Sequence, residues 1–369
     1  MNKSLKLWAL LLTVTIGLAQ EKNEVKWSFS GYLETYYSYD FNQPEAPMKL
    51  PFMYNYNRHN EFNVNLGLVR VKAEYDNVYA SLALQSGTYV EDNYANETTK
   101  IINEAFVGLY LDQAQKNTVE FGILPSYIGF ESATTGANLT LTRSMLAENS
   151  PYFMTGVKYT YKPNNQWQFS GLVTNGWQRI NKPDKNISPA LGSQIVYKPK
   201  ENSTFNWSTF IGKELYNGQW GMRYFSNWYW DKQWNAEWRT ILGFDAGMQT
   251  DVTNNDSKLF WMSPVMMVQY TLTPKWQTAF RAEYYQDKDN VIITTEDSFK
   301  TFGISFNIDY LLNDKVKFRT EARHLNSQEK VFVKEASLTN ILAVSTCHAL
   351  LQDSCWKFFT PSVGFVICI

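Results

Sequence analysis

Apolar and polar residues alternate along much of this chain, and this period of two constrains the fold more than any other feature. In residues 301–312 the apolar positions are Phe302, Ile304, Phe306, Ile308, Tyr310 and Leu312, and the positions between them are mostly small or polar. Segments 276–285 and 316–323 follow the same pattern. Because successive side chains of a strand point to opposite faces, each segment predicts a strand with one apolar and one polar face.

Further alternating segments predict a protein built almost entirely of strands. Short turns such as Asp76-Asn77 and Asn313-Asp314 alternate with longer polar stretches. The longer stretches are 41–58, 91–99, 124–152, 178–190, 250–258 and 287–298. In residues 62–75 the apolar positions change parity, which predicts a β-bulge near Gly67. About 15 segments precede His324 and one more follows Glu329, so we expect about 16 strands.

A soluble β-sandwich or propeller and a transmembrane β-barrel both contain many short amphipathic strands. About 22 residues per strand and connection suit the roughly 9–11 residues with which a tilted strand crosses a bilayer. Aromatic residues at the ends of the apolar faces, such as Trp27, Tyr37, Trp238 and Trp276, are typical of interfacial girdles. We therefore predict an all-β fold, an antiparallel up-and-down transmembrane barrel with short periplasmic turns and long extracellular loops. It is closed because backbone groups in lipid must all be paired.

The beginning of the chain differs from the barrel pattern. Residues 1–20 combine Lys3 and Lys6 with an apolar stretch and small residues before the expected cleavage site at Ala19 or Gln20. This arrangement predicts a secretory signal peptide. The outer-membrane barrel is then expected over residues 21–340.

The tail 341–369 also departs from the pattern. It holds all three cysteines, Cys347, Cys355 and Cys368, and it lacks sustained alternation. One interpretation is that the closing strand comes from about 330–346 or from 361–369. The other is an altered reading frame after about Asn340.

Composition argues against several function classes. Lys and Arg total 34 and Asp and Glu total 35, so the chain lacks the basic excess of a nucleic-acid binder. Only three His and three Cys occur, without a CxxC pair, so neither a zinc site nor another cofactor is indicated. After residue 20 no apolar run approaches the length of a membrane-spanning helix.

The polar face of each strand suggests a function. If the apolar face contacts outer-membrane lipid, the polar face lines the lumen, and about 16 strands leave room for an aqueous channel. The sequence thus predicts passive diffusion of small polar solutes or ions. The candidate pore-lining residues are Glu34, Arg239, Asp245, Arg281, Glu283, Asp309, Lys317, Arg319, Glu321 and Arg323. The alternative is that these charges stabilise a plugged lumen.

The stretch 124–152 is the longest between clear strands. Long loops in compact proteins are usually functional or disordered, and the apolar residues here argue against disorder. The loop is a candidate constriction that folds inward, with Glu131, Arg143 and Glu148 setting selectivity. An outer loop that packs on its neighbours is the alternative.

Several motifs carry a resemblance to a known family. They are FSGYLETYYSYD at 29–40, YNRHNEFN at 56–63, PSYIGFES at 125–132, LTRSMLAENSPY at 141–152, NGWQRI at 175–180 and RAEYY at 281–285. With the signal peptide, they resemble the putative OmpL-like β-barrel porin-2 family of Gram-negative outer membranes, over roughly residues 25–335. The resemblance implies an outer-membrane porin-like barrel. Porins often form trimers, so a homo-oligomer is an expectation by analogy.

Two other classes remain as alternatives. A hydrolytic barrel would use His59 or His324, but no GxSxG motif occurs, and we expect no enzyme. Asp287 and Asp289 fall short of the 6–8 oxygen ligands of calcium. A structural or adhesive barrel would bind through its long loops and would not conduct.

Overall fold

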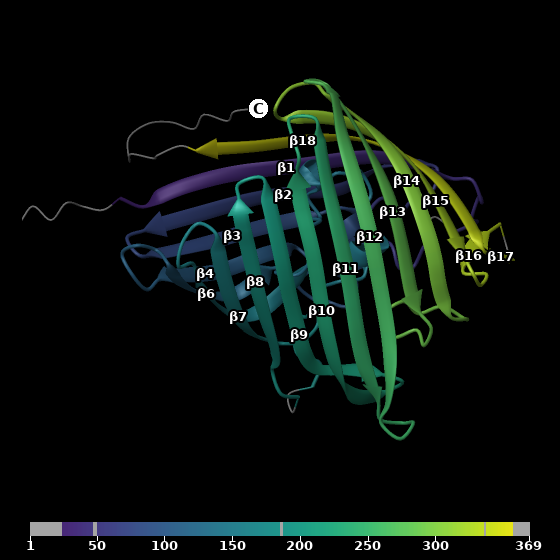
Figure 1. The fold of residues 1–369 in the computed structure, drawn as a ribbon, viewed down its shortest axis with the longest axis horizontal. Helices are drawn as coiled ribbons and strands as arrows, with labels where there is room; N and C mark the ends of the chain where they lie inside the picture. Colours follow the sequence, from purple (N-terminus) through teal and green to yellow (C-terminus); the bar gives the residue numbers. More distant parts are fainter. Residues whose placement is uncertain (1–23, 47–49, 185–186, 336, 357–369) are drawn as a thin grey trace, which may run out of the picture.

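Sixteen antiparallel strands form a closed barrel in the computed structural model, which describes residues 24–46, 50–184, 187–335 and 337–356 (Figure 1). This confirms the predicted fold class and strand number. The predicted signal peptide at 1–20 and the last part of the tail, 357–369, lie outside the described residues.

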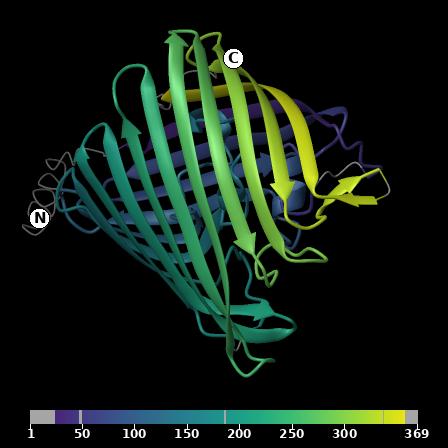
Figure 2. The ribbon, with the colours of Figure 1, turned by 45° about the vertical axis from the view of Figure 1, so that its right-hand side comes forward.

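The strands run in sequence order around the ring, except that the last one closes it. The first eight are β1 (Lys26–Asp40), β2 (Glu61–Tyr75), β3 (Val78–Ser86), β4 (Ile102–Tyr110), β5 (Asn117–Pro125), β6 (Phe153–Tyr161), β7 (Trp167–Thr174) and β8 (Ala190–Lys200). The others are β9 (Ser203–Tyr216), β10 (Gln219–Gln233), β11 (Trp238–Asp251), β12 (Ser257–Thr273), β13 (Trp276–Asp287), β14 (Phe299–Leu311), β15 (Val316–Ser327) and β18 (Ile341–Trp356). A small hairpin of β16 (Phe332–Lys334) and β17 (Ser337–Thr339) extends from the connection between β15 and β18 (Figure 2).

The two faces of the wall follow the alternation in the sequence. On β14, Phe302 and Phe306 are each 50% exposed on the outer face, whereas Ser305, Asn307 and Asp309 are buried inside. Aromatic pairs such as Trp276 with Tyr310, 4.8 Å between ring centroids, lie at the strand ends. Among the described residues, no helix has the length and hydropathy that a membrane-crossing helix needs.

Connections are short at one end of the barrel and mostly long at the other, as the sequence predicts. β1 begins and β18 ends at the short-turn end of the barrel, where Ser28 pairs with Trp356. The connection between β9 and β10 is a tight turn on the long-loop side. Its two residues, Asn217 and Gly218, have φ values of 48° and 76°, which fit a type I′ hairpin turn.

The parity change predicted in residues 62–75 corresponds to an irregularity in the pairing of β1 with β2. The register shifts where Glu34 pairs with Leu66 and Thr35 pairs with Val64, so Asn65 is the extra residue. The bulge lies two residues before Gly67. It turns Leu66 and Leu68 toward the interior, where both are buried.

β18 closes the barrel by pairing with β1 on one side and β15 on the other. The sequence suggests 330–346 or 361–369 for this strand, and the structure has Ile341–Trp356 instead. The physical reason is a partly apolar inner face: Leu342, Val344 and Leu350 are buried inside the barrel beside Thr346 and His348, while most outward positions are apolar as well. Side chains of β18 therefore alternate between the two faces, but the residue types do not show it because both faces carry apolar residues.

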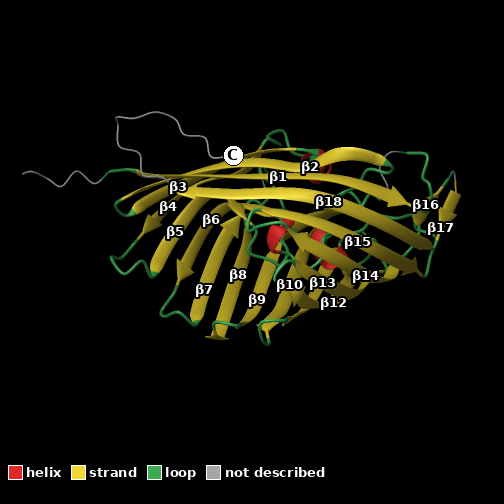
Figure 3. Cartoon of the chain, turned by 90° about the horizontal axis from the view of Figure 1, so that it is seen from above, coloured by secondary structure: helices red, strands yellow, loops and turns green. Residues whose placement is uncertain are grey.

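The hydrophobic core lies inside the barrel. Residues of the wall, such as Phe299 and Leu325, pack against Leu50, Phe52 and other residues of inward-folded loops. The helices α2 (Thr88–Asn93) and α3 (Met145–Glu148) and the 3-10 turn η1 (Thr135–Ala137) are surrounded by strands (Figure 3). The lumen is thus substantially filled by protein.

Replacing Ala349 by Pro tests closure by β18. Ala349 lies between Thr35 on β1 and Phe318 on β15, and a proline there removes a ladder donor from a strand paired on both sides. We expect Ala349→Pro to reduce the heat-modifiable, SDS-resistant form on gels to a minor fraction. Ala349→Val keeps the N–H and should retain that form; equal folding of the two variants would contradict closure at this position.

Candidate functional site

The connection between β5 and β6 folds into the lumen; we call residues 126–152 the inward loop. Every residue from Asn138 to Pro151 is buried. The loop contains only η1 and α3 as regular structure, so most of its backbone N–H and C=O groups need partners from elsewhere. The site is built from the groups that supply them.

Six charged side chains on β13, β14 and β15 form a cluster on the inner wall. The nitrogen–oxygen distances are 2.9 Å for Arg281–Glu321, 2.7 Å for Arg323–Glu283 and 2.8 Å for Arg319–Asp309. Three guanidinium groups face three carboxylates, so the cluster is neutral when all six are ionised. Burial of such pairs is tolerated only when further hydrogen bonds satisfy their remaining atoms.

The inward loop provides those further hydrogen bonds. Glu321 accepts from the backbone N and the Oγ1 of Thr142, at 2.7 and 2.6 Å. Arg281 donates to the Thr142 carbonyl at 2.6 Å. Glu283 accepts from the Met145 backbone N at 2.7 Å. Arg323 likewise donates to the Arg143 carbonyl at 3.1 Å. Except for Asp309, which accepts from Arg319 and Asn307, each charge of the cluster therefore binds both its ionic partner and the loop.

Arg319 holds the part of the loop that contains η1. Its Nη1 donates to the Thr135 carbonyl at 3.0 Å, and its Nη2 donates to the carbonyls of Asn138 and Leu139 at 3.1 and 3.0 Å. Lys317 donates to the Gly136 carbonyl at 3.0 Å. Carbonyl groups buried without such donors would each cost about 1–3 kcal/mol.

Glu34 on β1 is a further anchor of the inward loop. Its Oε1 accepts from Thr135 Oγ1 at 2.6 Å, from Tyr56 OH at 2.7 Å and from Tyr32 OH at 2.9 Å. Its Oε2 accepts from Asn65 Nδ2 at 2.7 Å, which gives the bulge residue a role. The carboxylate thus connects two strands, the loop 41–60 and the inward loop.

The loop reaches the far wall at Tyr127. The Tyr127 hydroxyl donates to the Thr209 carbonyl on β9 at 2.6 Å, and Gln194 on β8 donates to the Tyr127 carbonyl at 2.9 Å. In the ring of sixteen strands β9 stands eight places from β1, where Thr135 is anchored. The loop therefore spans a diameter of the lumen.

The three charged loop residues that the sequence singles out are all buried. Glu131 accepts from the Ser144 backbone N and Oγ, and burial raises the pKa of its carboxyl group despite the opposing effect of Arg281 and Arg143. The Arg143 guanidinium lies 3.7 Å from the centroid of the Tyr152 ring. Glu148 accepts from the Tyr54 backbone N at 2.9 Å. These contacts tie the inward loop to itself and to the loop 41–60.

The structure divides the ten candidate pore-lining residues into two groups. Glu34, Arg281, Glu283, Asp309, Lys317, Arg319, Glu321 and Arg323 meet at the inward loop. Asp245 accepts from Asn227 at 2.5 Å near the Tyr127 end of the loop, and Arg239 pairs with Asp231 at 2.7 Å, away from the loop. Their role in conduction stays a prediction.

A second set of inward charges, on β2, β4, β5 and β6, escapes sequence analysis. Arg70 pairs with Glu104 at 2.7 Å, and Lys158 pairs with Glu120 at 2.5 Å. Their side chains remain partly accessible, at 28% for Arg70 and 21% for Lys158. After the parity change at Asn65, Arg70 lies between the outward positions Val69 and Val71, so the alternation there could have found Arg70. Alternation of Val157, Lys158 and Tyr159 could have found Lys158.

The side chains considered for hydrolysis or calcium binding accept hydrogen bonds from backbone N–H groups. His59 Nδ1 accepts from the Asp40 backbone N at 3.0 Å. Asp287 accepts from the backbone N–H groups of Val291, Ile292 and Ile293. The part of the chain that the structure describes contains no group of three or more His, Cys, Asp or Glu residues that could hold a metal ion.

Comparison with protein families gives one match. The model of the family described as putative beta-barrel porin-2, OmpL-like, matches residues 26–350. The sequence matches no curated protein.

Solved porin structures share the fold at very low identity. The outer membrane channel DcaP of Acinetobacter baumannii has a TM-score of 0.61 and 11% identity, covering 90% of this chain and 99% of that one. The anion-selective porin from Comamonas acidovorans has a TM-score of 0.59 and 7% identity, covering 89% and 100%. OmpT of Vibrio cholerae, in a trimer form, has a TM-score of 0.59 and 11% identity, covering 89% and 99%.

Substitution of Arg319 tests whether the wall charges hold the loop. Arg319→Ala removes donors to three loop carbonyls and leaves Asp309 buried without its ion-pair partner, at a cost of about 3–5 kcal/mol. We expect trypsin to cleave folded Arg319→Ala barrels after Arg143 at least tenfold faster than the unmodified protein. Arg239→Ala, whose pair with Asp231 does not touch the loop, is the matched control, and equal cleavage of both variants would contradict the anchoring role.

Proposed function

Because the chain belongs to the putative OmpL-like β-barrel porin-2 family, it is a porin-like outer-membrane barrel, and we propose that it conducts small polar solutes or ions. The observation that carries this proposal is that the inward loop covers only one side of the inner wall. The inward loop covers the charges of β13–β15, whereas the inner face of β2–β6 keeps accessible charged side chains. The proposed path runs between the inward loop and β2–β6.

The lining of that path is polar and carries both signs of charge. Arg70 pairs with Glu104, Lys158 pairs with Glu120, and the Tyr79 hydroxyl donates to Glu120 at 3.1 Å. Paired charges compensate one another, so their field favours neither ion sign strongly. We therefore propose a narrow, hydrated and weakly ion-selective channel, in which the inward loop sets the width.

A structural barrel that does not conduct is the second candidate. The packing of the lumen favours it: the cavity between the loop 41–60, Thr142 and Arg323 has a volume of only about 30 Å³. Such a space holds about one or two water molecules. Single-channel recording in planar bilayers separates the two candidates, because a structural barrel would give no discrete conductance steps.

Two substitutions that remove, in turn, the positive and the negative member of one ion pair test the path. Lys158→Gln removes a cation from the lining and should shift the permeability ratio toward cations by roughly twofold, and Glu120→Gln should shift it toward anions. Reversal potentials across a KCl gradient measure both. Lys200→Gln, at the exposed last residue of β8, is the control. Identical reversal potentials for the two lining variants would contradict a path along β6.

Shortening the inward loop tests its role in setting the width. Replacement of residues 132–142 by a short Gly-Ser linker removes the contacts with Glu34, Arg319 and Glu321. We expect conductance to rise several-fold, since the loop spans a diameter of the lumen. If the unmodified protein is silent and the shortened variant conducts, the barrel is closed by its loop and the diffusion role is overturned.

Two further expectations belong to this proposal. Export requires removal of residues 1–20, and N-terminal sequencing of the membrane-isolated protein gives the cleavage position. A homo-oligomer is proposed by analogy with the trimer form of Vibrio cholerae OmpT. Native mass spectrometry of the detergent-extracted protein measures the number of copies.

A further inference from the structure

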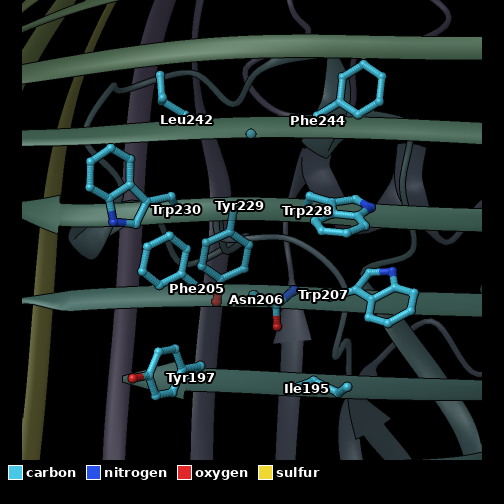
Figure 4. Close-up of a pocket in the computed structure, with 11 residues that line it drawn as sticks. Ile195, Tyr197, Phe205, Asn206, Trp207, Trp228, Tyr229, Trp230, Leu242 and Phe244 are labelled. Carbon is cyan, nitrogen blue, oxygen red and sulfur yellow. The ribbon is translucent and has the colours of Figure 1, made fainter. Parts of the chain in front are cut away.

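The outer face of β8–β11 carries a groove of about 370 Å³ near the short-turn end (Figure 4). Its walls are two rows of apolar side chains that run across the strands. One row is Tyr197, Phe205, Trp230 and Leu242, and the other is Ile195, Trp207, Trp228 and Phe244. The residues between the rows, among them Asn206 and Tyr229, belong to the inward-facing set, so the space above them stays open.

Strand register creates the groove. Phe205 pairs with Tyr197 and Trp230, and Trp207 pairs with Ile195 and Trp228, so each row continues in register from strand to strand. Rows two residues apart are separated by roughly 7 Å, and four strands give a length of roughly 14 Å between the outermost strands. An α-helix, about 10 Å wide, does not fit between the rows, whereas one extended hydrocarbon chain does.

The indole rings are fixed by hydrogen bonds within the sheet. Trp207 Nε1 and Trp228 Nε1 both donate to Ser226 Oγ, at 2.9 and 2.8 Å, and Trp230 Nε1 donates to Ser203 Oγ at 3.0 Å. An unpaired N–H group in hydrocarbon is costly, and here the protein satisfies all three itself. The rings therefore present rigid apolar surfaces to the groove and need no polar group from an occupant.

The position of the groove identifies its occupant. The outer face of the barrel meets lipid, and short turns of such barrels lie on the periplasmic side. The wall residues Trp228 and Trp230 lie within six positions of the end of β10 at Gln233, near the short-turn end. We propose that the groove binds one acyl chain of a glycerophospholipid of the periplasmic leaflet. The proposal rests on the outer-membrane placement and is independent of conduction.

A photoactivatable phosphatidylethanolamine with a diazirine in its acyl chain tests the proposal in vesicles that contain the folded full-length protein. Proteolysis and mass spectrometry then map the adducts. We expect labelling of 203–233 to exceed that of 276–311 at least threefold. Trp228→Ala should remove this excess, whereas Trp276→Ala, at an outward aromatic of similar exposure (44% against 51%), should not.

A milder variant guards against misfolding of Trp228→Ala. Ser226→Ala keeps every ring but removes the acceptor of two indole N–H groups, so it should lower the excess labelling by about half. Equal labelling around the barrel, or an excess that survives Trp228→Ala in folded protein, would overturn the proposal. Protection of 203–233 together with a Trp228→Ala change in oligomer mass would also overturn it, because a second copy of the chain would then cover the groove.

Discussion

The need to pair every backbone N–H and C=O group where water is scarce governs both the wall of this protein and its contents. The wall meets the need by closing: β18 pairs with β1 and β15, so each of the sixteen described barrel strands is paired on both sides. The lumen holds a loop with little regular structure, which pairs only a few of its own backbone groups. Charged side chains of β13–β15 take the place of a neighbouring strand for that loop.

This arrangement gives a reason for burying six charges in one place. An isolated buried ion pair gains little over an apolar pair, because desolvation offsets the attraction between the charges. Here all of the charges except Asp309 also satisfy backbone groups, as Glu321 does for Thr142 and Arg319 does for Thr135, Asn138 and Leu139. The charges on the opposite wall, such as Lys158 and Glu120, bind only each other and side chains, and they keep access to solvent. One inner surface thus holds the inward loop, and the other keeps partly accessible charges.

Sequence alone predicts those parts of the fold in which the polarity of a single residue decides whether its side chain faces outward or inward. Alternation places Phe302 outside and Asn307 inside without knowledge of any neighbour. It fails for β18, where Leu342 and Val344 are apolar because inward loops pack on them. For Arg70 it holds only once the change of parity is recognised, because the extra residue at Asn65 reverses inner and outer positions along β2. The alternation assigns Arg319 to the inner face correctly, but its partners are loop carbonyls about 180 positions away, and no local pattern encodes such a contact.

The same separation between the inward loop and its anchors sets an order of assembly. Thr142 is joined to Arg281 and Glu321 by hydrogen bonds that bridge 139 and 179 positions of the chain. Closing such long intervals is entropically expensive and slow. The loop cannot dock until the final third of the polypeptide has entered the sheet, so an incomplete barrel carries an undocked segment between β5 and β6. Docking of the inward loop therefore depends on strands that lie late in the sequence, although the loop itself lies in the first half of the chain.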